Sequence, residues 1–93
     1  MRTIWKFPLK LQDEPQVIVM PKDAKLLFFG SKGQATIDLW AEVETLNKSE
    51  LRTFIIYGTG HEINRKDVYY VGSTIDPPFV WHLYEGMKGK KIW

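Results

Sequence analysis

The stretch Ala35–Glu44, which reads ATIDLWAEVE, alternates apolar and polar side chains along its whole length. Successive side chains of a β-strand point to opposite faces, so this period of two predicts a strand with one face in a core. The apolar face carries alanine, isoleucine, leucine, alanine and valine, whereas Trp40 lies among acidic side chains on the other face. Such a strand is typical of a sheet that packs one face and exposes the other.

Shorter runs on both sides of this stretch predict further strands. They cover Trp5–Leu11, Gln16–Met20, Lys25–Phe29, Arg52–Tyr57, Val68–Ile75 and Phe79–Tyr84. Pro8 cannot donate to a ladder, so we expect the first of these strands to lie at a sheet edge or to bulge there. Gly30–Gly33 predicts a four-residue hairpin loop. About six or seven short strands without a helix of ordinary length predict an all-β fold, an antiparallel sandwich or a partly open barrel.

Length and composition restrict the class of protein. A chain of 93 residues makes one domain, for which we expect a β domain over residues 1–85 and a basic C-terminal tail over residues 86–93. Since 44% of the residues are hydrophobic, intrinsic disorder is excluded as the main state. The absence of cysteine excludes disulfides and thiolate metal sites.

Charge and hydropathy bear on partners and location. The formal net charge of +2 is small for a protein that binds duplex nucleic acid, so that partner is not expected. No apolar run approaches the ~18 residues of a membrane span. The first residues, Met1–Lys6, lack the apolar centre of a signal peptide. We therefore expect a cytoplasmic protein without a membrane partner.

The sequence carries no recognisable catalytic or metal-binding motif. His61 and His82 are the only histidines, and neither lies in a zinc-ligand spacing. The chain has no G-x-S-x-G nucleophile motif. The sequence thus predicts no catalytic residues, no metal ligands and no cofactor.

The segment Gly58-Thr59-Gly60-His61 follows directly after a buried strand. Two glycines let the backbone bend sharply and let another group approach it closely. Its functional interpretation is a turn whose backbone N–H groups bind an anion, with the Thr59 hydroxyl and His61 as further contacts. Its structural interpretation is a glycine-bearing corner between two strands.

Other side chains have two interpretations each. Trp5 and Lys6 could stack on and pair with a nucleotide, although a tryptophan in a terminal strand more often packs into the core. Trp40 could anchor a partner or lie under a loop. Lys88, Lys90 and Lys91 with Trp93 suggest a partner interface or a solvated tail. His82 faces away from Trp81 and Leu83. A lone histidine at such a position is more often a hydrogen-bonded structural residue than a ligand-binding one.

Six segments resemble a family of short proteins encoded by bacteriophages and prophages. The matching residues are Thr3–Phe7, Met20–Lys22 with Ala24–Lys25, Leu39–Ala41, Arg52–Phe54, Gly58–His61 with Ile63, and Tyr70–Ser73. The resemblance extends from Met1 to about Glu85, and Gly58–His61 is its most specific part. It implies a phage origin and a role in the cytoplasm of an infected bacterium, and it carries no catalytic residues over to this chain.

These observations lead to three functional hypotheses. The first is a non-catalytic protein that counters host defence by sequestering a nucleotide-type immune signal, bound by Gly58, Thr59, Gly60, His61, Trp5, Lys6 and Arg52. Because so short a chain can scarcely enclose a ligand, this hypothesis includes a homo-oligomer. The second is a direct inhibitor of a host defence complex, with Trp40, Lys88, Lys90, Lys91 and Trp93 at the interface. The third is a protein that binds single-stranded nucleic acid.

Overall fold

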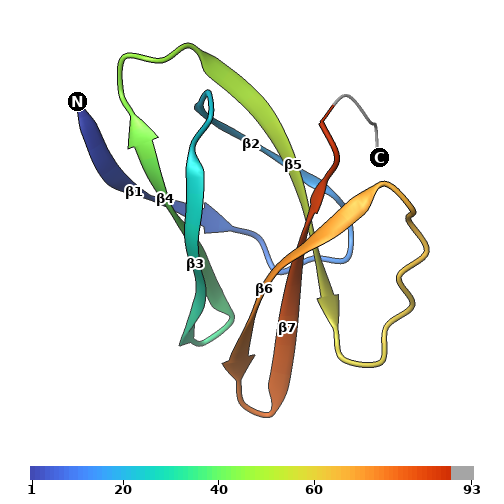
Figure 1. Ribbon diagram of the computed structural model, residues 1–93. Helices are drawn as coiled ribbons and strands as arrows, with labels where there is room; N and C mark the ends of the chain where they lie inside the picture. The colour runs from blue at the N-terminus through green and yellow to red at the C-terminus, as the bar shows by residue number, and fades with distance from the viewer. Residues whose placement is uncertain (89–93) are drawn as a thin grey trace.

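The computed structural model describes residues 1–88, and their fold is all-β (Figure 1). These residues form seven antiparallel strands: β1 (Arg2–Leu9), β2 (Gln16–Pro21), β3 (Lys25–Gly33), β4 (Thr36–Glu44), β5 (Ser49–Gly58), β6 (Val68–Asp76) and β7 (Phe79–Gly86). Sheet A has the strand order β1-β4-β3, and sheet B has the order β2-β5-β7-β6. The predicted all-β fold is confirmed as a sandwich of two sheets. Within the described part of the chain no helix could span a membrane.

The core lies between the two sheets and follows the predicted alternation of β4. Ile37, Leu39, Ala41 and Val43 are buried, as the period of two requires. Sheet B covers them mainly with Phe54, Ile56 and Leu83, which come from its two central strands β5 and β7. The central strands of both sheets therefore supply most of the core.

The sandwich is closed along one side and open along the other. The edge strands β3 and β6 lie side by side, and the backbone N–H of Ser31 donates to Thr74 Oγ1 at 3.0 Å across this seam (Figure 1). The opposite edge of sheet A is β1, which carries Pro8 and pairs only with β4, as the proline predicts. Trp5 lies opposite Ala41 on the inward side of this open edge, yet 42% of it is exposed.

The hairpin between β3 and β4 differs from the prediction. A loop over Gly30–Gly33 was expected, but β3 continues to Gly33 and the bend falls on Gln34 and Ala35. Their φ angles are 57° and 60°, a left-handed conformation that residues other than glycine rarely adopt. Gly30 instead lies within the strand, at a position where a Cβ would collide with the ring of Phe28.

The strained hairpin gives a direct test of this register. Replacing Ala35 with glycine removes the Cβ clash of the left-handed conformation, so we expect Ala35→Gly to raise the free energy of unfolding by about 0.5–1 kcal/mol. The same exchange at Ala41, which is buried in β4, should lower it by at least about 1 kcal/mol. Denaturant titration measures both variants, and a loss of stability in Ala35→Gly would contradict the turn.

Candidate functional site

A shallow cavity of about 250 Å³ lies where β5 ends and the chain turns away from sheet B. We call it the β5 cavity. It is lined by Tyr57, Gly58, Thr59, Gly60, His61, Ile63, His82 and Tyr84. The strand residues come from the centre of the sheet, since Tyr57 pairs with His82 and Ile55 pairs with Tyr84 across β5 and β7. One wall of the cavity is therefore formed by the two central strands of sheet B, and the other by the turn after β5.

A continuous chain of hydrogen bonds beside this cavity joins the turn after β5 to strands β7 and β6. Thr59 Oγ1 lies 2.8 Å from His82 Nε2, and Ser73 Oγ lies 2.7 Å from His82 Nδ1. Ser73 Oγ also lies 2.7 Å from the hydroxyl of Tyr70. We call these four residues the hydroxyl–imidazole chain. Because hydroxyls rotate and the imidazole has two tautomers, each member can act as a donor or as an acceptor.

One polar atom of the cavity wall has no partner. Tyr57 is 6% exposed, and its buried hydroxyl has no hydrogen-bond partner among residues 1–88. A buried polar group without a partner costs free energy, and such groups are rare in native structures. The ring of Tyr57 meets that of Tyr84 edge-on at 5.4 Å, and Tyr84 meets Tyr70 at 5.7 Å. The cavity thus combines an aromatic wall with an unused hydrogen-bonding group.

The turn Gly58–His61 has a local structural explanation. The backbone N–H of Gly58 donates to His61 Nδ1 at 3.2 Å, and the N–H of His61 donates to the Gly58 carbonyl at 3.0 Å. A Cβ on Gly58 would lie 2.9 Å from His61 Cε1, while Gly60 has a φ of +89°. Gly60 is therefore required by its backbone conformation and Gly58 by its contact with the imidazole of His61, and the Gly58 N–H is not available to an anion. Ligand binding by this turn stays a prediction. Thr59 is the residue of the turn that belongs to the hydroxyl–imidazole chain.

The other residues predicted to bind the ligand lie elsewhere. Trp5 and Lys6 belong to β1 in sheet A, where Lys6 Nζ lies 5.9 Å from the ring centroid of Trp40. Arg52 lies in the first half of β5, six residues before Gly58, which is about 20 Å along an extended strand. The structure does not bring these three residues to the β5 cavity.

The residues predicted for a partner interface are described only in part. Trp40 is half-buried on the outward side of sheet A, and Lys88 is exposed. Lys90, Lys91 and Trp93 lie outside the described residues, so that part of the interface stays a prediction.

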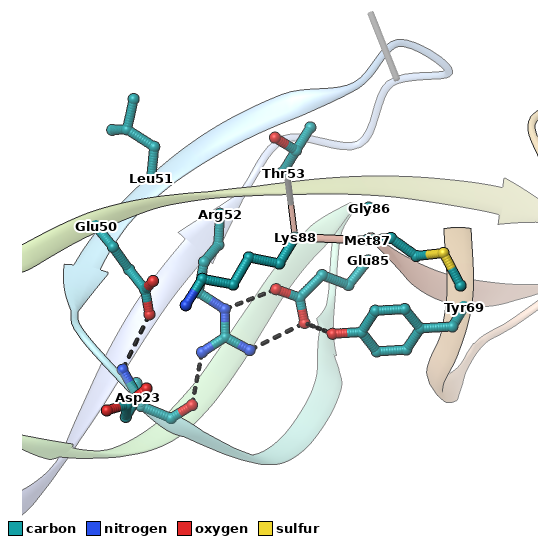
Figure 2. Close-up of a pocket in the computed structure, with 11 residues that line it drawn as sticks. Asp23, Glu50, Leu51, Arg52, Thr53, Tyr69, Glu85, Gly86, Met87 and Lys88 are labelled. Carbon is teal, nitrogen blue, oxygen red and sulfur yellow. Dashed lines mark hydrogen bonds and ion pairs between the residues drawn. The ribbon is translucent and has the colours of Figure 1, made fainter. Parts of the chain in front are cut away.

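Arg52 belongs to a second, larger cavity of about 330 Å³ at the other end of β5 (Figure 2). Its Nε and Nη2 donate to the two carboxylate oxygens of Glu85 at 2.6 and 2.9 Å, and its Nη1 donates to the carbonyl of Ala24 at 2.6 Å. The hydroxyl of Tyr69 donates to Glu85 at 2.7 Å. The guanidinium is thus engaged by groups of the chain itself, which makes Arg52 a structural residue here.

The environment of this pair shifts two pKa values. The hydrogen bonds to Glu85 raise the pKa of Arg52 above its ordinary value. Burial, followed by the hydrogen bond to Glu85, raises the pKa of Tyr69 to about 12. Although 45% of Tyr69 is exposed, its hydroxyl faces a glutamate that is only 4% exposed. Loss of the phenol proton would therefore place a second negative charge against a buried carboxylate.

Sequence reasoning missed the hydroxyl–imidazole chain. Its members come from the turn after β5 and from strands β6 and β7, and only the strand register brings them together. The available signal was the alternation in β7, which sets His82 and Tyr84 on the face opposite Trp81 and Leu83. Within residues 1–88 no group of three or more histidine, aspartate or glutamate side chains could hold a metal ion.

Comparison with known proteins gives a family but no named relative. A family model described as a domain of unknown function (DUF7352) matches residues 1–92. No curated protein and no solved structure matches the chain.

The contact between Gly58 and His61 can be tested by a double-mutant cycle. Gly58→Ala should lower the free energy of unfolding by about 1–3 kcal/mol, because its methyl group meets the imidazole ring. His61→Ala should cost about 1 kcal/mol for the lost hydrogen bond. In the double variant the clash is absent, so its loss should be smaller than the sum of the single losses. Additive losses, measured by denaturant titration, would contradict the packing described.

The raised pKa of Tyr69 predicts a loss of stability in alkali. The stability linked to the Tyr69 proton is complete below the unfolded pKa of about 10. This stability is lost as the pH rises toward about 12, because in that window Tyr69 loses its proton in the unfolded chain but keeps it in the folded chain. We expect Tyr69→Phe to lose less stability than the wild type between pH 9.5 and 11.5 in denaturant titrations. Tyr70→Phe, whose hydroxyl contacts Ser73 instead, is the control and should follow the wild type.

Proposed function

The chain belongs to the DUF7352 family, a domain of unknown function, and we propose that it is a non-catalytic protein that binds a nucleotide-type ligand in the β5 cavity. The observation that carries this proposal is the buried Tyr57 hydroxyl, which lacks a partner in the wall of the cavity. The hydroxyl is buried behind the cavity wall, so a ligand that displaces a wall side chain and hydrogen-bonds to it would remove the cost of leaving it unpaired. The neighbouring hydroxyl–imidazole chain offers further donors and acceptors to the same ligand.

The lining of the cavity favours the base of a nucleotide over its phosphates. Two tyrosines, two histidines and Thr59 present ring faces and hydrogen-bonding groups, and none of the described residues that line the cavity is a lysine, an arginine or a carboxylic acid. A nucleobase has a flat ring that stacks on aromatic side chains and an edge that exchanges hydrogen bonds. Phosphate groups prefer arginine or lysine, so in this proposal they extend from the cavity toward solvent.

The surroundings of His82 support binding without catalysis. Both ring nitrogens contact hydroxyls, those of Thr59 and Ser73. Within residues 1–88 no carboxylate makes a hydrogen bond or an ion pair to this imidazole. Acyl-transfer triads place a carboxylate there to orient the ring and stabilise the imidazolium. The hydroxyl–imidazole chain is better suited to hold a ligand than to transfer its groups.

The biological role follows from the resemblance to phage-encoded proteins. A small phage protein that binds a nucleotide and leaves it intact would act by lowering its free concentration. We propose that the ligand is a nucleotide-type signal of host defence and that the protein sequesters it in the bacterial cytoplasm. Because so short a chain can scarcely enclose a ligand, the proposal includes a homo-oligomer.

The binding proposal can be tested with a panel of nucleosides, mononucleotides and cyclic dinucleotides. At a ligand concentration well above Kd we expect at least one to raise the Tm, because a ligand bound only by the folded state stabilises it. Thr59→Val keeps the shape of the side chain but removes its hydrogen bond to His82, so affinity should fall about 5–10-fold. Calorimetric titration measures this change.

The matched control is Thr36→Val, the same exchange at an exposed position of β4 in the other sheet. It should bind as the wild type does. The proposal is wrong if no member of the panel binds, or if Thr59→Val and Thr36→Val bind with equal affinity.

A further inference from the structure

Strand β1 pairs with β4 on one side and with no strand of the described chain on the other. In an antiparallel pair the backbone N–H and C=O groups of alternate residues point toward the partner strand, and those of the residues between them point away. The N–H of Thr45 donates to the carbonyl of Met1 at 3.0 Å, and the register continues without a shift along the whole of β1. Even-numbered residues therefore direct their backbone groups toward the open edge, and these residues are Arg2, Ile4, Lys6 and Pro8.

The chain itself blocks the far end of this edge. Pro8 has no N–H that another strand could use. At Lys10 both backbone groups are occupied, because its N–H donates to Gln16 Oε1 at 2.9 Å and its carbonyl accepts from Gln16 Nε2 at 2.8 Å. The side-chain amide of Gln16 thus takes the place of a neighbouring strand. Within residues 1–88 no group bonds to the outward-directed backbone groups of Ile4 and Lys6.

The other edge strands of the sandwich are less open to an added strand. β3 and β6 lie side by side and cover each other's edges. On β2, the bond of 2.7 Å from the N–H of Lys22 to the carbonyl of Lys48 sets the alternation, which leaves two residues with outward backbone groups, Val17 and Val19. Proline on an edge strand prevents pairing with another chain, and this short stretch lies between Pro15 and Pro21.

We infer that Arg2–Lys6 of β1 pairs with an extended acidic segment of a partner protein, which becomes a fourth strand of sheet A. In such β-strand addition the free backbone groups supply hydrogen bonds, and alternate side chains supply specificity. Arg2 and Lys6 are exposed on the outward side of the sheet, one on either side of Ile4. Side chains directly opposite them in an added strand would lie about 5 Å away, so two carboxylates separated by three residues fit this edge. The edge belongs to the other sheet from the β5 cavity and does not depend on nucleotide binding.

The acidic side chains nearby leave these two cations available. Glu42 and Glu44 lie on β4, one strand further from the added segment. The contact of 3.7 Å between Glu42 Oε2 and Arg2 Nε is exposed on both sides, and such pairs contribute little. Glu44 already accepts a hydrogen bond from the amino group of Met1 at 2.7 Å. Lys6 makes no ion pair in the part of the chain that the structure describes.

The inward side of the same edge is apolar. Trp5 faces inward, its ring lies 6.3 Å from that of Phe7, and 42% of it is exposed at the open side of the sandwich. Because side chains alternate along a strand, those opposite Thr3 and Trp5 in the added segment would point inward as well. Apolar side chains there would cover the exposed part of the indole. The segment therefore carries an acidic residue at each end and apolar residues next to them.

A second copy of β1 fits this edge poorly. If β1 paired antiparallel with itself around Ile4, Arg2 of each copy would lie directly opposite Lys6 of the other. Like charges in directly opposite positions are destabilising, and this pair would occur twice. In the register that places Arg2 opposite Pro8, the proline has no N–H to donate. Charge therefore favours an acidic segment over self-pairing.

The inference is tested with the full-length protein and two synthetic peptides with blocked termini, GEVTVEG and the charge-reversed GKVTVKG. We expect the acidic peptide to slow deuterium exchange at the amides of Ile4 and Lys6 and to leave Val17 and Val19 unchanged. The basic peptide should bind at least about 10-fold more weakly, because it places two like-charged pairs across the strands. No protection of Ile4 and Lys6 at millimolar acidic peptide, or equal affinities of the two peptides, would overturn the inference.

Substitutions on the two free edges give the matched control. Ile4→Pro removes an N–H that faces the open edge and takes no part in the pairing with β4, so the fold should persist while affinity for the acidic peptide falls at least about 10-fold. Val19→Pro removes the equivalent N–H from β2 and should bind as the wild type does. Equal losses in the two variants would contradict the site.

Reversal of one charge provides a check that does not depend on proline. Lys6→Glu should weaken binding of the acidic peptide about 5–10-fold and strengthen binding of the basic one, because the pair opposite position 6 changes sign. Fluorescence anisotropy of labelled peptides measures both changes. A Lys6→Glu variant with the preference of the wild type would exclude the proposed pairing of charges.

Discussion

Strand β5 has to bury both of its faces, and the rest of the molecule is arranged around this requirement. Every residue from Thr53 to Gly58 is buried. On the inward side Phe54 and Ile56 join the main core, and on the outward side Ile55 and Tyr57 pack with Val68 and Tyr84 in a small second cluster. Because β5 is buried on both sides, it holds its neighbours β2 and β7 in register. The β5 cavity lies where this strand ends.

The buried ion pair between Arg52 and Glu85 in Figure 2 follows from the alternation of side chains along β5. Two residues before Phe54, the same alternation turns Arg52 toward the interior, where a charge without a partner would be costly. Glu85 lies opposite Phe54 on β7 and supplies the bidentate partner, while the carbonyl of Ala24 takes the remaining donor. Replacing one member of such a pair is far more costly than the net contribution of the pair to stability. The pair therefore links β5 to β7 and to the turn before β3.

The strands could be predicted from the sequence because their signal is local. The alternation of Ala35–Glu44 and the apolar run before Gly58 depend only on neighbouring residues, and both correspond to observed strands. The hairpin at Gln34 and Ala35 could not be predicted, since the left-handed conformation begins at Gly33 and continues onto two residues that rarely adopt it. The hydroxyl–imidazole chain escaped prediction for a different reason. Thr59, Ser73 and His82 are far apart in sequence and meet only through the register of three strands.

The structure also changes the role of Gly58–His61. Sequence alone offered both a binding turn and a structural corner, and the geometry shows a Gly60 with a φ of +89°, a Gly58 packed against the imidazole and a His61 that bonds to the turn. The chemistry at the end of β5 depends on Thr59, Tyr57 and the residues of β6 and β7 beside them. The central claim is that this outward surface of sheet B is the binding surface. Backbone and imidazole chemical shifts, followed during titration with the nucleotide that raises the Tm most, test it most directly. The account predicts shifts at Tyr57, Thr59, Ser73 and His82, and shifts confined to Arg52 and Glu85 or to sheet A would contradict it.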